Sequence, residues 1–277
     1  PRLKVCTVFG GVSINPQMLA LRGGADIVVA TTGRLLDLLQ HNALKFDALQ
    51  TLVLDEADKM LSLGFSEELA QVLAALPKKR QNLLFSATFP PELQQLITSL
   101  LHNPVQINLA KQDENLIEQH VYNVESERKN AALIHLIKTG DWQQVLVFAS
   151  AKNTCNRLVL KLEKAGIQAA AFHGDLSQSA RNNALEQFKA KKIRVLIATD
   201  VAARGIDIQQ LPYVVNFDLP RSANDYIHRI GRTGRAGQQG YAVALICADE
   251  EEHFRLIEKR MKKRVPREQI EGFEIPL

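Results

Sequence analysis

The sequence predicts an α/β fold in which doubly wound parallel sheets are covered by helices on both faces. Short apolar runs of Val, Ile, Leu and Ala recur along the 277 residues, and amphipathic segments separate them. The runs lack polar alternation, which favours strands buried on both faces of a parallel sheet. Regular alternation of strand and helix is typical of a doubly wound architecture.

The apolar runs predict ten strands: Lys4–Phe9, Asp26–Ala30, Thr51–Leu54, Leu83–Phe85, Val121–Val124, Val145–Phe148, Ala169–Phe172, Arg194–Ala198, Tyr213–Phe217 and Ala242–Ile246. Helices are expected at Phe65–Leu76, Pro91–Leu101, Arg128–Lys138, Thr154–Lys164 and Ser179–Lys189. The polar stretch Leu109–Gln119 has no clear period and interrupts this rhythm. We therefore expect a first lobe over residues 1–110, a linker over 111–118 and a second lobe over 119–277.

Composition narrows the class of protein only broadly. A hydrophobic content of 46% is sufficient for two cores. The net charge of +4 and a pI near 9.0 suit a polyanionic partner, although many enzymes without such a partner share these values. Cys6, Cys155 and Cys247 lack metal-ligand spacing and are expected to be reduced core residues of a cytosolic protein. The sequence has neither an apolar run of about 18 residues nor a recognisable signal peptide.

The acidic stretch Asp55-Glu-Ala-Asp58 directly follows the run Thr51–Leu54. Open α/β sheets bind ligands at the carboxyl ends of their strands. A carboxylate there can hold Mg²⁺ through water, and a neighbouring one can orient an attacking water. The alternative is a solvated acidic turn at the start of a helix. Ser86-Ala-Thr88 follows the next run and could be a ligand contact or an ordinary turn.

The basic stretch His228-Arg-Ile-Gly-Arg-Thr-Gly-Arg235 is the most specific pattern, with three arginines and two glycines in eight residues. Guanidinium groups bind phosphate, and glycine allows close approach of the backbone to a ligand. Residues Ala198–Asp207 add a hydroxyl, carboxylates, an arginine and a glycine after another run. The alternatives are a basic solvated loop and a polar strand end.

Weaker elements could offer backbone amides, hydroxyls or guanidinium groups to phosphates, and each could equally be a turn or a cap. They are Gly10-Gly11, Thr31-Thr-Gly-Arg34, Gly174 and Gln178-Ser-Ala-Arg181. The run Lys259-Arg-Met-Lys-Lys-Arg264 fits a solvated helix end, with an RNA contact as the alternative.

Taken in order, these elements resemble the DEAD-box ATP-dependent RNA helicases, and the resemblance covers essentially the whole chain. The stretch Val8–Gln17 is similar to the bacterial RhlE-like branch. The resemblance implies two RecA-like doubly wound parallel-sheet domains, the first truncated at its amino end. It implies RNA-stimulated ATP hydrolysis coupled to local unwinding of RNA duplexes or remodelling of RNA–protein complexes. A cytoplasmic monomer acting on ribosomal or RNA-decay assemblies would be typical of the family.

The resemblance also implies roles in using ATP and Mg²⁺. Asp55 would hold Mg²⁺ through water, with Glu56 beside it activating the attacking water. Arg232 and Arg235 would reach the β- and γ-phosphates, Arg235 being the favoured arginine finger. The remaining residues expected around the nucleotide are Asp58, Ser86, Thr88, Gly205, Asp207 and His228. Among them Asp58 would tie the acidic stretch to the site, Ser86 and Thr88 would couple hydrolysis to unwinding, and Asp207 would hold the ribose.

RNA would be held through its backbone, with low sequence selectivity. The residues expected to contact it are Gly10, Gly11, Thr31, Gly33, Arg34, Gly174, Gln178, Arg181 and Thr199. Position 32 is Thr where the family usually has Pro, which changes the stiffness of the loop more than its chemistry.

One departure from the family concerns the nucleotide. No Gly-x-x-x-x-Gly-Lys-[Ser/Thr] phosphate loop occurs, and no glycine is followed by lysine. We therefore expect a first lobe that lacks its phosphate cradle. The alternative function is a catalytically inactive RNA-binding fragment. A DNA translocase of the same superfamily is disfavoured, because the motif sequences Asp-Glu-Ala-Asp and Ser-Ala-Thr are those of RNA helicases.

Overall fold

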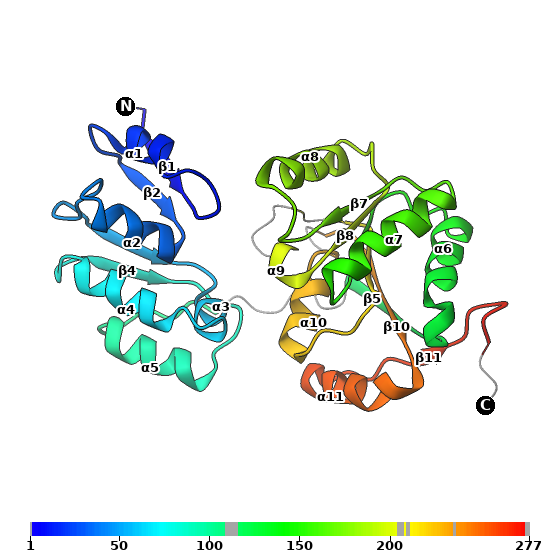
Figure 1. Cartoon of the computed structure of the whole chain (residues 1–277). Coiled ribbons are helices and arrows are strands. Elements are labelled where there is room, and N and C mark those ends of the chain that lie inside the picture. Colours follow the sequence, from blue (N-terminus) through cyan, green and yellow to red (C-terminus); the bar gives the residue numbers. More distant parts are fainter. Residues whose placement is uncertain (1, 109–115, 204–207, 209–210, 235–236, 275–277) are drawn as a thin grey trace. The chain divides into compact units, whose positions relative to one another are not determined.

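Figure 1 shows the computed structural model of the chain, which describes residues 2–108, 116–203, 208, 211–234 and 237–274. The chain divides into two compact units, Pro1–Asn108 and Leu109–Leu277. Each unit is an α/β structure whose strands pair in parallel. None of the helices in these described ranges is long and apolar enough to cross a bilayer.

Unit 1 contains two short parallel sheets. Strand β1 (Val5–Val8) pairs with β2 (Ile27–Ala30), and β3 (Thr51–Leu54) pairs with β4 (Gln81–Leu84). The helices are α1 (Asn15–Leu21), α2 (Thr32–Gln40), α3 (Ala57–Ser62), α4 (Ser66–Ala75) and α5 (Pro91–Leu100). A helix follows each of the four strands, and it begins within three residues of the end of β2 and of β3.

The strands of unit 1 are not buried on both faces, contrary to the prediction. Leu54 and Val8 are buried, but Val29, Val53 and Phe85 are each more than half exposed. Each sheet of the described unit has only two strands, so every strand lies at an edge. Separate small cores form around Leu38 in one half of the unit and Leu93 in the other.

Unit 2 is built on one seven-stranded sheet in the order β11-β5-β10-β9-β6-β8-β7. Its strands are β5 (Ile117–Asn123), β6 (Val145–Phe148), β7 (Ala169–Phe172), β8 (Val195–Ala198), β9 (Tyr213–Asn216), β10 (Gly240–Ile246) and β11 (Arg267–Glu268). Its helices are α6 (Lys129–Thr139), α7 (Lys152–Lys164), α8 (Gln178–Lys189), α9 (Asp200–Ala203), α10 (Ala223–Ile230) and α11 (Glu251–Met261), with single 3₁₀ turns at Ser126–Arg128 and Ala248–Glu250.

Alternate residues of these strands face two different helical layers, which is the doubly wound arrangement. Val147 and Ile197 pack with Leu133 of α6 and Leu158 of α7. Residues of opposite orientation, such as Leu196, pack with α8 and α9. The sheet residues nearest β11 pack with α10 and α11. The near-continuous apolar runs therefore reflect burial on both faces here.

Element bounds follow the apolar runs closely. Strands β3, β6 and β7 span the predicted residues, and the other predicted strands differ by up to four residues at an end. The largest difference is at β5, which begins at Ile117, so the last two residues of the expected linker are strand residues. Polar side chains are tolerated there because Glu118 stays partly exposed while its backbone pairs with Tyr241. Residues 111–115 of the expected linker lie outside the described residues.

Candidate functional site

The acidic stretch of unit 1 lies where β3 ends and α3 begins. Asp55 and Glu56 are exposed, whereas Asp58 is buried within the first turn of α3. Glu56 adopts a left-handed backbone conformation, with φ 49° and ψ 44°. Such a conformation costs a non-glycine residue of order 1–2 kcal/mol. The turn projects two carboxylates from the strand end and returns the third to the protein interior.

The interior carboxylate joins the acidic stretch to Ser86-Ala-Thr88. The Thr88 hydroxyl donates to Asp58 Oδ2, while Asp58 Oδ1 accepts the Lys59 N–H at 3.0 Å. The Ser86 hydroxyl donates to the Thr88 carbonyl at 2.6 Å, which fixes the turn that carries Thr88. The backbone adds a bond from Ala57 N–H to Phe85 O at 3.1 Å. The structure thus brings together two of the predicted motifs, which follow neighbouring strands.

The two exposed carboxylates fit a magnesium ion held mainly through water. Asp55 Oδ1 accepts the Glu56 N–H at 2.9 Å, which orients the carboxylate at the strand end. In the described parts of the chain no three His, Cys, Asp or Glu side chains are grouped as a metal site. Mg²⁺ is commonly bound by one or two carboxylates together with waters and substrate phosphates. The donor set at Asp55 and Glu56 suits that mode.

A second group of predicted residues meets at the ends of β1 and β2. The Thr31 N–H donates to Val8 O at 3.1 Å, which ties the start of α2 to the end of β1. Thr31 is the N-cap of α2, and Thr32 is its first residue, a position that also accepts proline. Gly10 and Gly11 follow β1, and Gly11 has a φ of 79°. The loop carrying both glycines therefore lies beside the start of α2.

Arg34 holds this arrangement from within. Its side chain is 8% exposed, and Nη2 donates to Val12 O at 2.7 Å, immediately after the two glycines. Nε forms an ion pair with Asp37 Oδ2 at 3.5 Å. Nε and Nη1 are buried and have no hydrogen-bond partner among the described residues. The sequence predicted an arginine aimed at a ligand, whereas the structure shows one that also braces the Gly-Gly loop.

In unit 2, Gly174 and Thr199 follow the neighbouring strands β7 and β8. Phe172 and Ala198 are paired in register at the ends of these strands. The Thr199 N–H donates to Phe172 O at 3.3 Å, and Thr199 O accepts the Ala203 N–H at 2.9 Å. Thr199 is 9% exposed. The pairing places both predicted RNA-binding positions at one end of the sheet.

Gln178 and Arg181 lie in the first turn of α8, close to that sheet end in sequence. Ser177 caps the helix by accepting the Ala180 N–H at 3.1 Å. Arg181 Nη2 donates to Gln178 Oε1 at 2.7 Å, whereas its buried Nε has no partner in the described structure. The two side chains therefore form one polar unit with donor capacity remaining.

Arg229 is a central residue of unit 2 that the sequence pattern did not distinguish. Its side chain is 2% exposed and donates to both carboxylate oxygens of Asp200, at 2.6 and 2.7 Å. Nη1 donates to Asn216 Oδ1 at 2.9 Å and to Asp218 O at 2.6 Å. Its guanidinium also lies 4.9 Å from the centre of the Phe148 ring. This arginine joins the start of α9 to α10 and is not available to a phosphate.

Thr233 and Gly234 form the turn after α10. The buried Thr233 hydroxyl donates to Leu211 O. Gly234 has a φ of 63°, and a Cβ there would lie 3.0 Å from Leu116 O and collide with the Ile117 side chain. Only glycine satisfies both conditions. This glycine therefore serves close packing of the turn against the start of β5.

The predicted nucleotide-binding residues of unit 2 are partly described. His228 is half-buried on α10, and Arg232 is half-buried just after the helix. The Arg232 N–H donates to Arg229 O at 3.1 Å, and its carbonyl accepts the Leu211 N–H at 3.2 Å. Gly205, Asp207 and Arg235 lie outside the described residues.

Comparisons with known proteins agree with this organisation. Residues 1–96 match the family model described as DEAD/DEAH box helicase, and residues 128–237 match the helicase conserved C-terminal domain. The ATP-dependent RNA helicase RhlB of Pseudomonas syringae is 40% identical over 95% of this chain and 68% of its own length. The ATP-dependent RNA helicase CshA of Listeria monocytogenes is also 40% identical, over 95% of this chain and 51% of its own length. The chain thus spans about half the length of several curated relatives.

Solved structures give the same result. Dbp5 of Saccharomyces cerevisiae, bound to RNA and ADP-BeF3, is 30% identical with a TM-score of 0.84, covering 98% of this chain and 71% of that one. A DEAD box protein from Methanococcus jannaschii is 40% identical with a TM-score of 0.55, covering 96% of this chain and 72% of that one.

Proposed function

The chain belongs to the DEAD-box helicase family, and on that premise we propose that its residues serve RNA-stimulated ATP hydrolysis. The proposed hydrolysis is coupled to local unwinding of RNA duplexes or remodelling of RNA–protein complexes. The observation that carries the proposal is the hydrogen bond from Thr88 to Asp58. It joins the two motifs of unit 1 and leaves Asp55 and Glu56 exposed at the end of β3.

The proposed roles in hydrolysis follow from charge and exposure. Asp55 would hold Mg²⁺ through water, and the ion would supply charge compensation at the phosphates. Glu56 would orient the attacking water and accept its proton. Arg232, together with Arg235, would supply positive charge for the phosphates, and Asp207 would hold the ribose. The Thr88–Asp58 bond would keep the acidic turn in register with the strand beside it.

RNA is the proposed partner, held through phosphates and 2′-hydroxyls. Arg34 Nη1 and Arg181 Nε are buried without a hydrogen-bond partner in the described structure. A change of side-chain rotamer would bring these nitrogens to phosphate oxygens, which guanidinium groups bind well. The other proposed contacts are backbone amides and hydroxyls at strand and helix ends, at Gly10, Gly11, Thr31, Gly33, Gly174, Gln178 and Thr199.

A second candidate function is RNA binding without hydrolysis by these 277 residues alone. The sequence has no Gly-Lys pair, so it contains no phosphate-loop lysine. That lysine cradles the β- and γ-phosphates in nucleotide-hydrolysing enzymes of this type. The 277 residues by themselves are expected to bind RNA and to show no RNA-stimulated ATP hydrolysis.

The test of hydrolysis uses a chain extended at its amino end by a segment that carries a phosphate loop. In that chain Glu56→Gln should lower kcat for RNA-stimulated ATP hydrolysis by about 10²-fold or more, with the Kd for ATP nearly unchanged. Glu67→Gln, an exposed residue at the start of α4, is the matched control and should retain activity. Full hydrolysis by the Glu56→Gln variant would remove that residue from the proposed role.

A further inference from the structure

The end of α11 carries a group of cations that the proposed helicase site does not use. A cavity of about 540 Å³ there is lined by Arg255, Glu258, Lys259, Lys262, Lys263 and Arg264. Five of these six residues are cationic, and all five are exposed. We refer to these five residues as the α11 basic cluster.

The backbone gathers the cluster on one side of the helix end. Arg255 and Lys259 are four residues apart on α11, so they lie on the same face about 6 Å apart along its axis. At Lys262 the chain adopts a left-handed conformation, with φ 54° and ψ 28°. The N–H groups of Lys262 and Lys263 both donate to Glu258 O, which turns the chain back over the last helical turn.

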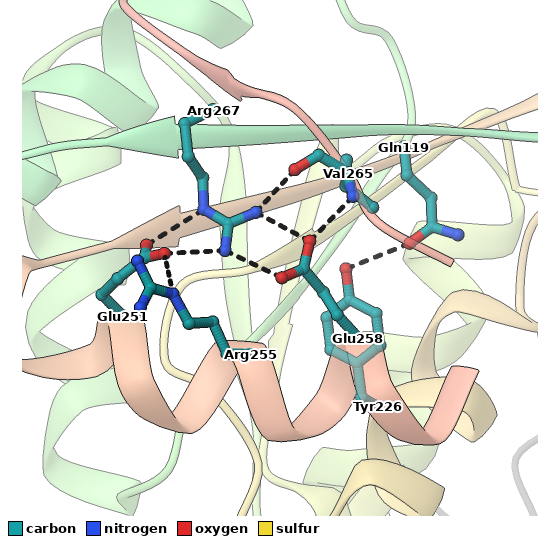
Figure 2. A network of polar contacts seen from close by, with 7 residues as sticks. All are labelled: Gln119, Tyr226, Glu251, Arg255, Glu258, Val265 and Arg267. Carbon is teal, nitrogen blue, oxygen red and sulfur yellow. Dashed lines mark hydrogen bonds and ion pairs between the residues drawn. The ribbon is translucent and has the colours of Figure 1, made fainter. Parts of the chain in front are cut away.

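The nearest carboxylates are already neutralised from the inner side of the helix. Figure 2 shows Arg267 reaching between Glu251 and Glu258, with two bonds to Glu258 at 2.9 and 3.0 Å. The Val265 N–H adds a third bond to Glu258 at 2.7 Å. Hydrogen bonds from Arg267 hold the pKa values of Glu251 and Glu258 below their usual range. Both carboxylates are therefore ionised at neutral pH, and the Arg267 guanidinium already binds both.

Among the five cations of the cluster, Arg255 alone has a carboxylate partner in the described structure. Arg255 forms an ion pair with Glu251 at 3.1 Å, and its side chain is 66% exposed. Within the described ranges, no carboxylate lies at ion-pair distance from Lys259, Lys262, Lys263 or Arg264. Four positive charges without an ion-pair partner in the described structure lie beside one cavity, and such a concentration of charge attracts a polyanion.

The cluster is remote from the other RNA-binding elements proposed for unit 2. The seven-stranded sheet has β11 and β5 at one edge and β7 at the other. Helix α11 packs on the strands near β11, through Phe254 and Ile257. Gly174 and α8 follow β7, at the opposite edge. A ligand at the cluster would therefore occupy a different surface of the unit.

We propose that the α11 basic cluster is a second binding site for the phosphate backbone of RNA. Ammonium groups of three lysines and the guanidinium groups of two arginines bind phosphate oxygens. The cavity lining contains no aromatic side chain on which a base could stack, so binding is independent of sequence. The choice of RNA as the polyanion rests on the proposed function; the position of the site rests on its charges alone.

The test is equilibrium binding of a fluorescein-labelled oligouridylate to the 277-residue chain, without nucleotide, at several salt concentrations. The variant Lys259→Gln, Lys262→Gln, Lys263→Gln should raise Kd about tenfold at low salt. The slope of log K against log salt should fall by about 2, because three phosphate contacts are lost from a single strand. The matched control removes three exposed lysines of α6 and α7, at Lys138, Lys161 and Lys164, and should change Kd less than twofold.

Two outcomes would overturn the proposal. The first is that the triple variant at Lys259, Lys262 and Lys263 binds RNA as tightly as the control variant does. The second is that polyglutamate displaces the labelled RNA as effectively as polyuridylate at equal charge. The second outcome would assign the cluster to an acidic protein surface. Circular dichroism of each variant checks that the fold is retained. ATP hydrolysis is measured separately in the extended chain. If that chain does not hydrolyse ATP but the triple lysine variant still binds RNA more weakly, only the proposed function is contradicted.

Discussion

Asp200 and Arg229 face each other through two parallel hydrogen bonds, in which Nε and Nη2 of the arginine donate to separate carboxylate oxygens. Arg229 is 2% exposed, whereas the Asp200 side chain is 28% exposed. The pair joins the residues just after β8 to helix α10. It therefore connects two motifs that lie far apart in sequence and carry most of the predicted chemistry of unit 2.

Asp200→Asn should destabilise unit 2 by about 3 kcal/mol, because it leaves a buried guanidinium without its counter-charge. Urea unfolding followed by circular dichroism measures the change. The control is Asp141→Asn, which removes another carboxylate that pairs with an arginine, Arg194, at 3.1 Å. The Asp141 side chain is 80% exposed, so its loss should change stability by less than about 1 kcal/mol. Equal effects of the two substitutions would contradict a structural role for the buried pair.

Thr88→Val keeps the shape of the side chain and removes the hydroxyl that donates to Asp58. The buried Asp58 carboxylate then loses a hydrogen-bond donor, and unit 1 should lose about 1–3 kcal/mol of stability. Thermal unfolding of unit 1 within the whole chain reports the loss. Thr98→Val, on the exposed face of α5, should have little effect because its hydroxyl bonds only to the Gln94 carbonyl of its own helix. A stable Thr88→Val protein would mean that Asp58 finds another donor.

Substitution of two glycines distinguishes the cost of backbone strain from the cost of a steric clash. Gly234 and Gly237 both have positive φ, but only at Gly234 would a Cβ meet other atoms. Gly237→Ala should cost about 1 kcal/mol from strain alone. Gly234→Ala should cost at least about 2 kcal/mol more, because the start of β5 must move away from the turn. The difference between the two unfolding free energies is the measurement, and a difference near zero would exclude the close approach.

The Glu258 carboxylate predicts a specific pH dependence. Hydrogen bonds from Arg267 lower its pKa from the ordinary value of 4.5, so its contribution to stability is complete above that value. The contribution falls as pH drops through the lowered pKa, because the protonated form loses its attraction to Arg267. Glu258→Gln should therefore be less stable than the original chain at pH 7, and the gap should narrow as the pH falls below 4.5. Urea midpoints across this range test it; a constant gap would contradict the coupling.

Much of unit 2 could be predicted from sequence because its strands are buried on both faces. Runs such as Val145–Phe148 contain no polar residue, so the ends of the run mark the ends of the strand. In unit 1 the same reasoning located the strands but not their exposure, since an apolar run does not reveal how many neighbours its sheet has. The burial of the Arg229 side chain could not be predicted either. Composition shows three arginines in one stretch, but only the helical face of α10 determines that this one points inward.

The candidate site was predictable in part for the same reason. The acidic and Ser-Ala-Thr stretches follow adjacent strands, so parallel pairing brings them together, as the Thr88 bond to Asp58 shows. The Gly-Gly and Thr-Thr-Gly-Arg stretches lie close together for the same reason, because they follow the paired parallel strands β1 and β2. The bracing contact from Arg34 to Val12 O was not predictable, because it depends on a side chain folding back across the loop.

The position of β5 has a consequence for the order in which the chain can fold during synthesis. It is the first strand of unit 2 to be made, yet it pairs only with β10 and β11, the last two. At ribosomal rates the intervening residues take roughly 10 s to appear. During that interval the β6–β9 part of the sheet can assemble around its own helices, while β5 has no strand to receive it. We therefore expect the sheet of unit 2 to be completed only when β10 pairs with β5, and a nascent chain arrested before β10 should expose β5 to chaperones and proteases.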